Sequence, residues 1–456
     1  MTVVVLGAGI AGLVAGCELT RLGYNVRIVE ADGRVGGRIF THHFQCECSD
    51  SYGELGAMRI PSSHKSTLRY IEEVNLQDRL IPFRGLFTEP DGIVDFSGHV
   101  SRFRNAREAA RRVGAIHDHR LAYLSDIRVV VHAVCPPHLR HYYDTNVEPL
   151  VARILESLRP GDIDEPIGSL SVFRRLAPFL RQVDNEFKVV VDDILLELSE
   201  EIYTLRGGLS LLPESLALRL GSRITRNVRV TGINCTDEVA EIAMRDEGGR
   251  ASVLKADRII CTIPFSILRH IFITGLSERQ IQRVQALPYS PASKTLLHCR
   301  TRFWERRGIR GGGSVNDRWS RQIFYPDSKS IKSSCTCGVL LASYAIGGDA
   351  LQLGNLEEQE RNSVITAELA RFHPEILSPD AVLSWKTMDW NEHRFSRGAY
   401  ASAWVDKHIP FESLHDLTPE RLLTFAGEHC STLGGWIEGA IKSALTSVED
   451  VAGARL

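Results

Sequence analysis

The stretch that decides the fold is VVVLGAGIAG at residues 3–12, where an apolar run leads into the spacing G-x-G-x-x-G. The apolar residues 3–6 predict a parallel strand that is buried on both faces. Gly7 permits a tight turn after this strand, Gly9 lets the backbone approach a pyrophosphate, and Gly12 lets a helix pack closely on the strand. The motif therefore predicts a strand–turn–helix unit that binds a dinucleotide.

The residues that follow complete this unit. Residues 13–22 are expected to form a helix that Gly23 ends, and residues 26–29 form a second apolar strand. The free N–H groups and the dipole at the start of the helix favour phosphates. Glu30 follows the second strand directly, where its carboxylate can accept hydrogen bonds from a ribose. Strand, helix, second strand and acid together make the dinucleotide prediction specific.

The composition is that of an ordinary globular protein. The chain has 456 residues and a formal net charge of −2, and at about 150 residues per domain this length predicts two or three domains. The charge balance gives no reason to expect nucleic acid or a membrane surface as a partner. No apolar run reaches the roughly 18–20 residues that cross a bilayer, and the N-terminus lacks the basic region of a signal peptide. We therefore expect a cytoplasmic protein.

Cysteine spacing argues against a metal centre. The ten cysteines include two close pairs, Cys46/Cys48 and Cys335/Cys337. Both pairs are C-x-C and not the C-x-x-C that is usual for zinc sites and thioredoxin-like redox motifs. The pattern predicts reduced thiols in a cytosolic protein, and no metal site is expected.

Two further segments point to a flavin. Residues 34–38 read RVGGR, and residues 425–443 read FAGEHCSTLGGWIEGAIKS. They resemble the two FAD signatures of the flavin-containing amine oxidase family, so the resemblance implies FAD as the cofactor. The planar fork of Arg38 suits the diphosphate charge, and the family's acid at Glu428 meets the ribityl–phosphate region. A helix that starts near Trp436 would stabilise negative charge at the pyrimidine end of the flavin.

The resemblance assigns a set of residues to the FAD site, drawn from the glycine loop, the second strand end, the two signatures and two intervening segments. These residues are Gly7, Gly9, Ile10, Ala11, Gly12, Glu30, Ala31, Arg34, Gly37, Arg38, Gly56, Ala57, Met58, Arg59, Val230, Gly427, Glu428, Gly435, Trp436 and Ile437. Monoamine oxidases attach their flavin to a cysteine at the position that is Ala399 here. Non-covalent FAD is therefore expected.

The resemblance spans the chain and implies an α/β (α+β) fold. The expected architecture is a Rossmann-like FAD-binding domain of the amine oxidase type, with an inserted mixed-sheet substrate domain and a helical subdomain. Residues 105–200 have few glycines and helix-period apolar positions, which favours the helical subdomain. The expected boundaries are 1–45, 201–272 and 396–456 for the FAD-binding domain, 46–104 and 273–395 for the substrate-binding domain, and 105–200 for the helical domain.

Within the family, the segment ELGAMRIP at residues 54–61 is most similar to L-amino acid oxidases. In that branch the arginine of this motif, Arg59 here, binds the substrate carboxylate. A buried guanidinium suits this task because it can donate two parallel hydrogen bonds. Tyr325 resembles the tyrosine that adds a hydroxyl donor to the same carboxylate. A structural salt bridge for Arg59 and simple packing for Tyr325 are the alternatives.

Three other residues complete the expected catalytic set. Lys294 resembles the family lysine that holds a water near the flavin, although a surface lysine on an edge strand is the alternative. Trp436 matches one aromatic wall beside the substrate. Tyr400 matches the opposite wall of monoamine oxidases, and the two could cage the substrate amine. L-amino acid oxidases often lack this second aromatic, so Tyr400 also favours simple amines.

The resemblance implies FAD-dependent oxidation of the α-amine of an L-amino acid by hydride transfer to the flavin. The products would be an imino acid and then a 2-oxo acid, ammonia and hydrogen peroxide, with the amino acid and O2 as small-molecule partners and a homodimer as the assembly. An amino acid 2-monooxygenase and a polyamine or monoamine oxidase stay open as alternatives. His117 and His119 are candidates for a mobile base, although exposed polar residues are the simpler interpretation.

Overall fold

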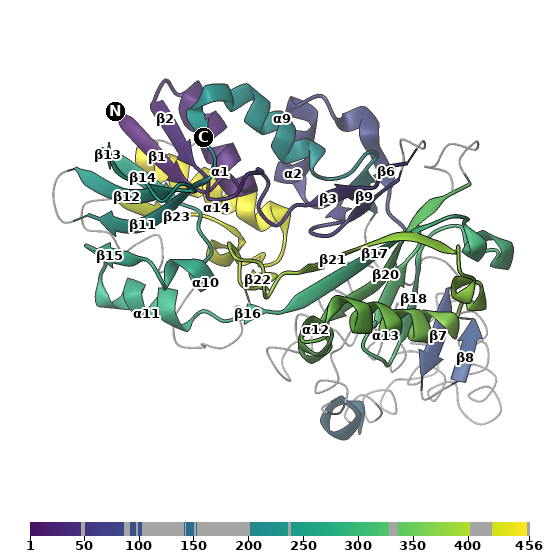
Figure 1. The fold of residues 1–456 in the computed structure, drawn as a ribbon. Helices are drawn as coiled ribbons and strands as arrows, with labels where there is room; N and C mark the ends of the chain where they lie inside the picture. The colour runs from purple at the N-terminus through teal and green to yellow at the C-terminus, as the bar shows by residue number, and fades with distance from the viewer. Residues whose placement is uncertain are drawn as a thin grey trace.

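The computed structural model describes residues 1–46, 51–85, 92–96, 99–102, 141, 143–149, 152, 201–235, 239–327, 336–401 and 422–453. The chain forms two lobes that lie side by side (Figure 1). The predicted helical domain at 105–200 lies outside the described residues except for a short piece that contains the π-helix Tyr143–Val147, and His117 and His119 lie outside them as well. Within the described ranges, no helix is long and apolar enough to cross a membrane.

The first lobe is built on a five-stranded parallel sheet with the order β10-β2-β1-β14-β23. Its strands are β1 (Thr2–Leu6), β2 (Asn25–Val29), β10 (Ile224–Thr225), β14 (Arg258–Cys261) and β23 (Leu423–Phe425). They come from all three segments that we assigned to FAD binding, and the predicted strands at 3–6 and 26–29 are confirmed. Segments far apart in the sequence thus form one sheet. Because its strands are parallel, their carboxyl ends lie at the same edge, where ligands of such folds bind.

Both faces of this sheet are covered, which explains the unbroken apolar run of β1. Val3 and Val5 pack toward α1 (Ile10–Arg21), α9 (Leu211–Leu220) and α14 (Ile437–Ala452). Val4 and Leu6 pack toward a second sheet of four strands. That sheet contains β11 (Val228–Asn234), β12 (Ala240–Asp246), β13 (Ala251–Ala256) and β15 (Phe272–Thr274). Alternate residues of a strand point to opposite faces, so each must be apolar here.

The glycine turn between β1 and α1 has the geometry that its motif predicts. Gly7 has a φ of +104°, which side chains rarely adopt. Gly12 sits in α1 directly against this turn, and a Cβ at Gly12 would overlap the Gly7 carbonyl oxygen. The helix can start this close to the strand only because Gly12 has no side chain.

We therefore expect Gly12→Ala to distort the turn and weaken flavin binding. Overpacking of this kind costs about 1–3 kcal/mol or more when the obstacle is backbone. The bound flavin per chain, read from its visible absorbance after gel filtration, and the thermal midpoint should both fall. Gly348→Ala is the matched control, since Gly348 also lies in a helix but has open space around it. Equal flavin content in the two variants would contradict the packing role of Gly12.

The second lobe is a seven-stranded mixed sheet with the order β21-β17-β20-β19-β18-β7-β8, antiparallel except for the parallel pair β18–β7. Its strands are β7 (Ile93–Phe96), β8 (His99–Arg102), β17 (Ala292–Cys299), β18 (Gly313–Asn316), β19 (Gln322–Phe324), β20 (Gly338–Ile346) and β21 (Val382–Asp389). Helices α12 (Gly348–Gly354) and α13 (Glu358–Ala370) cover one face (Figure 1).

Short elements join the lobes. The hairpin β3–β4 (Thr41–His43 and Tyr52–Glu54), the sheet β5-β9-β6 (Ile60–Pro61, Ile202–Leu205 and Leu80–Pro82) and the pair β16–β22 (Tyr289–Ser290 and Tyr400–Ala401) all lie between the sheets. Helix α2 (Lys65–Glu73) is capped by Glu438 at the start of α14, because this buried carboxylate accepts the backbone N–H groups of Ser66 and Thr67. Two further helices are α10 (Phe265–Leu268) and α11 (Glu278–Ala286).

Candidate active site

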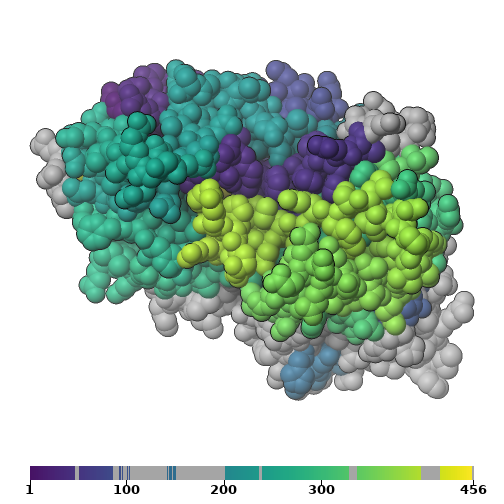
Figure 2. All heavy atoms as spheres, viewed as in Figure 1, coloured from purple at the N-terminus to yellow at the C-terminus, as the bar shows by residue number. Residues whose placement is uncertain are grey.

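A cavity of about 1010 Å³ runs from the glycine turn of the first lobe to the large sheet of the second. Ligand pockets commonly have volumes of roughly 300–1,000 Å³, so this one suits a long ligand. In the space-filling view, the purple N-terminal segment lies where the teal and yellow-green segments meet (Figure 2). The cavity is thus assembled from parts of the chain that are distant in sequence.

One end of the cavity is the start of helix α1. Gly7 and Gly9 line it, and Gly9 precedes the helix without a side-chain cap. The loop that carries Gly36 and Gly37 forms a bridge to Gly9, and a Cβ at Gly9 would have only the Cα of Gly37 within 4 Å. The helix therefore offers free N–H groups and positive dipole to an anionic ligand, with no side chain in the way.

Glu30 lies beside this helix start, as predicted. Its buried carboxylate accepts the backbone N–H of Ala8 at 2.5 Å and that of Asp32 at 2.8 Å. Burial raises the pKa of Glu30, while these two hydrogen bonds oppose the rise. The two backbone bonds hold the carboxylate at the cavity wall, where its remaining lone pairs can meet a ribose hydroxyl.

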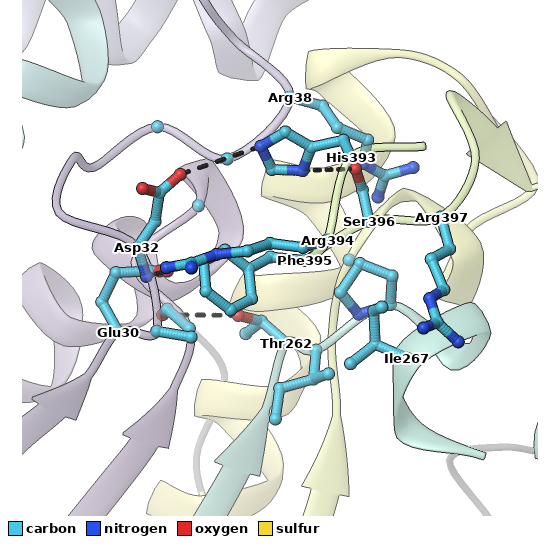
Figure 3. Close-up of a pocket in the computed structure, with 18 of the residues that line it drawn as sticks. Glu30, Asp32, Arg38, Thr262, Ile267, His393, Arg394, Phe395, Ser396 and Arg397 are labelled. Atoms are coloured by element: carbon cyan, nitrogen blue, oxygen red, sulfur yellow. Dashed lines mark hydrogen bonds and ion pairs between the residues drawn. The ribbon is translucent and has the colours of Figure 1, made fainter. Parts of the chain in front are cut away.

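Residues 393–397 form a wall of this end that the sequence did not reveal. His393 bonds the Ser396 hydroxyl at 2.9 Å and lies 3.9 Å from the Asp32 carboxylate. Arg394 and Phe395 extend toward Glu30 and Asp32 across the cavity (Figure 3). A histidine, an arginine and an aromatic residue within the seven positions before Tyr400 were the available signal, but they match neither FAD signature.

The middle of the cavity is held by an ion pair between the two predicted FAD signatures. Arg38 donates to Glu428 at 2.5 Å and to the Ala399 carbonyl at 3.1 Å. The Glu428 carboxylate also accepts the backbone N–H groups of Ala401 and of Gly435, the latter at 2.8 Å. Burial alone would raise the pKa of Glu428, but Arg38, His429 and the Gly435 N–H lower it below its usual value. The carboxylate is therefore ionised at neutral pH.

Residues 54–59 cross the far end of the cavity and are fixed by both lobes. The Glu54 carboxylate accepts the Thr41 hydroxyl at 2.9 Å and the Leu209 N–H at 2.7 Å. Trp390 donates its indole N–H to the Leu55 carbonyl at 2.7 Å, and Lys294 donates to the Gly56 carbonyl at 2.6 Å. These bonds hold the segment that leads directly to Arg59.

Lys294 is a buried lysine of the sheet interior. It lies in β17 between β20 and β21, only 4 % exposed, so the edge-strand alternative is wrong. Its ammonium lies 4.6 Å from the ring centroid of Tyr344, a cavity residue that the sequence did not single out. Burial lowers the pKa of Lys294, the Glu54 carboxylate opposes this, and Arg59 lowers it further. Burial in turn raises the pKa of Glu54.

The electrostatic interaction between Glu54 and Lys294 predicts the direction in which the pKa of Lys294 changes when Glu54 is substituted. Glu54→Gln keeps an acceptor for Thr41 and Leu209 but removes the charge that raises the pKa of Lys294. The pKa of Lys294 should therefore fall further, by about one unit or more for charges this close. We expect the acid limb of the kcat/KM profile to move to lower pH. Lys294→Met should abolish this shift when it is combined with Glu54→Gln, and a limb that moves to higher pH would contradict the coupling.

Two aromatic residues and Arg59 stand at this far end. Trp436 and Tyr400 both line the cavity, and a Cβ at Gly435, next to Trp436, would lie 3.6 Å from the Tyr400 ring. The Arg59 guanidinium lies 5.2 Å from the ring centroid of Trp436, within cation–π range. Arg59 does not itself line the cavity, but it stacks on a residue that does. The structure thus gathers Lys294, Tyr400, Trp436 and Arg59 at one end.

Most of the predicted cofactor residues do line this cavity. They are Gly7, Gly9, Ile10, Ala11, Glu30, Ala31, Arg34, Gly37, Arg38, Gly56, Ala57, Val230, Gly427, Glu428, Gly435, Trp436 and Ile437. Gly12 lies behind the glycine turn, where it serves the packing described above. Met58 is buried in an apolar cluster with Leu55 and Leu296. Neither residue is part of the cavity lining, and Arg59, the third predicted cofactor residue outside it, lies over Trp436.

Tyr325 is not brought to the cavity at all. It is 5 % exposed, and its hydroxyl bonds Ser314 and His373, each at 2.8 Å. It packs on the helix-covered face of the sheet with Trp304, while the preceding Phe324 packs on the opposite face. Successive strand residues alternate faces, so a shift of one position removes Tyr325 from the expected place. Its role as a carboxylate donor is not supported.

A family model described as flavin containing amine oxidoreductase matches residues 10–452. The chain belongs to this family of flavin-containing amine oxidoreductases, which confirms the resemblance and the expected fold class.

Curated relatives cover nearly the whole chain. The flavin-dependent L-tryptophan oxidase of Lentzea aerocolonigenes is 35 % identical over 467 aligned residues, which cover 98 % of this chain and 97 % of that protein. The L-amino-acid oxidase of Siganus canaliculatus is 28 % identical and covers 98 % of this chain and 85 % of its own length. The chain therefore contains nearly all of the segments that these oxidases have.

Solved structures share the fold. A putrescine oxidase bound to putrescine superposes with a TM-score of 0.64 at 19 % identity, over 99 % of each chain. The cyclohexylamine oxidase of Brevibacterium oxydans has a TM-score of 0.67 at 16 % identity, again over 99 % of each chain. At these identities the likeness concerns the architecture alone.

The family implies a flavin cofactor, and the cavity fits FAD. The uncapped start of α1 can bind a diphosphate, and the Glu30 carboxylate can bind a ribose. The Arg38–Glu428 pair lies between the α1 end of the cavity and the end that contains Lys294. The start of α14 at Ile437 faces the same cavity as Lys294. These groups occur in the order that a long dinucleotide needs, from phosphates to reactive ring.

Proposed function

We propose that this enzyme oxidises the α-amine of an L-amino acid and that Arg59 binds the substrate carboxylate. The observation that carries the proposal is the Arg59 guanidinium stacked on Trp436 at the end of the cavity that also contains Lys294. An amine without a carboxylate gives no reason for a guanidinium at this place. The similarity to an L-tryptophan oxidase and to L-amino-acid oxidases supports the same class.

Each residue of the far end has a distinct part in the proposal. Arg59 would hold the carboxylate with two parallel hydrogen bonds, which orients the substrate Cα–H toward the cavity. Tyr400 and Trp436 would flank the amine. Lys294 would hold a water for hydrolysis of the imino acid or for reoxidation. FAD, when bound, supplies the two-electron acceptor, and the protein supplies orientation and electrostatics.

L-tryptophan is the first substrate to test, because the similarity to the L-tryptophan oxidase covers 98 % of the chain. A second candidate function is the oxidation of simple amines, which the pairing of Tyr400 with Trp436 in one cavity favours. An amino acid 2-monooxygenase would use the same residues and differ in its products.

One screen separates these functions. The holoenzyme is incubated separately with each of the twenty L-amino acids, with putrescine and with a monoamine. For each substrate, peroxide release is measured and the organic product is identified. The proposal expects peroxide, ammonia and a 2-oxo acid from at least one L-amino acid. Turnover of amines alone would overturn it, and CO2 with an amide would identify a monooxygenase. Non-covalent FAD, the three-domain division, the cytoplasmic location and the homodimer stay predictions.

A further inference from the structure

Three side chains that can ligate a metal converge outside the active site. One sulfur each of Cys46 and Cys337 and one ring nitrogen of His298 all lie within 4.8 Å of one another. Cys46 follows strand β3, His298 lies in β17, and Cys337 directly precedes β20. The sequence separates these residues by as many as 291 positions, so the fold alone brings them together.

The spacing of the three ligand atoms suits a small tetrahedral ion. Zinc binds thiolate sulfur at about 2.3 Å and imidazole nitrogen at about 2.0–2.1 Å. Tetrahedral angles then require about 3.8 Å between two sulfurs and roughly 3.5 Å between sulfur and nitrogen. Here the two sulfurs are 3.3 Å apart. The sulfur–sulfur distance is thus about half an ångström shorter than the tetrahedral value, and the histidine nitrogen lies within 4.8 Å of both sulfurs.

His298 gives an independent indication of a missing partner. The residue is 3 % exposed and its ring stacks on Phe44 at 5.2 Å. Its Nε2 atom is buried with no hydrogen-bond partner among the described residues. Burial of a polar atom without a partner is unfavourable by roughly 1–3 kcal/mol. A bound cation at the cluster would add the ligand bond that favours keeping an imidazole in this position.

The surroundings resemble those of ligands in known metal sites. The Ser51 hydroxyl lies 3.4 Å from the Cys337 sulfur and can donate to a thiolate there. Such outer hydrogen bonds orient ligands and tune their basicity. Cys46 is exposed, so solvent can reach the cluster and supply a fourth ligand. Two sulfurs and one imidazole select a thiophilic ion such as zinc over magnesium or calcium.

We propose that Cys46, His298 and Cys337 form a zinc site that fastens the β3–β4 hairpin to the large sheet. Each thiol loses its proton to solvent when the ion binds, and no oxidant or reductant is needed. The proposal is independent of the amino acid specificity above. It also revises the expectation from C-x-C spacing, because one cysteine comes from each pair and sequence spacing within a pair does not describe the site.

The position of the site suggests its effect. The hairpin already packs tightly on the sheet, since a Cβ at Gly53 would lie 2.6 Å from Leu296 and 3.1 Å from Val339. The next residue, Glu54, interacts with Lys294, which lies in the same strand as His298. A metal clip at one end of this contact would stabilise the arrangement of Glu54 and Lys294 at the other.

The test uses the reduced, full-length holoenzyme. After removal of bound metal by a chelator, it is titrated with Zn²⁺, and metal per chain is measured after desalting. Co²⁺ is the spectroscopic probe, because thiolate ligation gives a charge-transfer band. We expect one Zn²⁺ per chain and a rise in the thermal midpoint for wild type. The control Cys235→Ser, at a half-buried cysteine directly after β11, should behave in the same way.

Cys46→Ser, Cys337→Ser and His298→Gln should each weaken Zn²⁺ binding at least about tenfold and lose the thiolate band or its intensity. Cys46 is exposed, so its variant keeps the test valid should a buried substitution impair folding, which flavin content would report. The proposal would be overturned if the wild-type enzyme bound no more Zn²⁺ per chain than Cys46→Ser. So would a Cys46–Cys337 disulfide that persists in the reduced enzyme, detected by mass spectrometry.

Discussion

Arg59→Ala should lower kcat/KM for the amino acid substrate by roughly two to four orders of magnitude. The reason is the loss of two hydrogen bonds to a carboxylate, each of which contributes about 1.5–3 kcal/mol in a site that excludes water. Every 1.36 kcal/mol in the barrier corresponds to about tenfold in rate. Arg59→Lys keeps the charge but loses the planar fork, so it should fall between wild type and Arg59→Ala.

Amine substrates in the same assay distinguish a carboxylate-binding role of Arg59 from a structural role. An amine without a carboxylate cannot use Arg59, so its kcat/KM should change little in Arg59→Ala. Arg69→Ala is the matched control, because Arg69 also lies over an aromatic ring, that of Tyr70 at 5.3 Å, but Tyr70, unlike Trp436, does not line the cavity. An equal loss for amines and amino acids, or a loss confined to the thermal midpoint, would show that Arg59 is structural.

The parts of the fold that the sequence predicted are those set by local rules. The glycine turn, strands β1 and β2 and the acid at Glu30 depend on turn geometry, unbroken apolar runs and spacing within about 30 residues. The sequence also pointed to the segment at 54–59, because its residues resemble a family motif, and Gly56 and Ala57 of this segment line the cavity. These features need no knowledge of which distant strands pair.

The features that the sequence did not predict depend on long-range placement. Tyr344 meets Lys294 through the register of β17 and β20, which pairs these two residues directly. The residues 393–397 reach the cavity only because β21 crosses the molecule beside β17. The expected position of Tyr325 differs from the structure for the same reason, because the sequence around one residue does not show which face of the sheet that residue occupies. The cluster at His298 likewise depends on segments that meet only in the folded chain.

Glu428→Ala should strip most of the flavin from the purified enzyme. Glu428 is 6 % exposed and accepts from Arg38, Ala401 and Gly435, so one carboxylate joins both FAD signatures. Its pKa is lowered in the folded protein. A carboxyl group of this kind contributes its stability above its unfolded pKa and loses it as the pH falls through the folded pKa. At neutral pH the full contribution is present and the substitution removes it.

The size of this effect follows from what is left behind. Removal of one partner of a buried ion pair costs about 3–5 kcal/mol, and this is the upper limit here because the Arg38 side chain is 21 % exposed. When about 3 kcal/mol of this loss falls on the FAD complex and not on the apoprotein, FAD binding weakens by about a hundredfold, because each 1.4 kcal/mol is tenfold in affinity. Glu428→Gln keeps an acceptor for the backbone donors, so its flavin content should be intermediate.

The control separates loss of the cofactor from loss of stability. Glu368→Ala removes another largely buried carboxylate, one that accepts the Ser320 N–H at 2.9 Å in the second lobe, away from the cavity. It should lower the thermal midpoint without changing the flavin per chain after gel filtration. If Glu428→Ala retained stoichiometric flavin, the Arg38–Glu428 pair would be a structural link alone. The cavity would then have to hold the middle of the dinucleotide by its backbone groups.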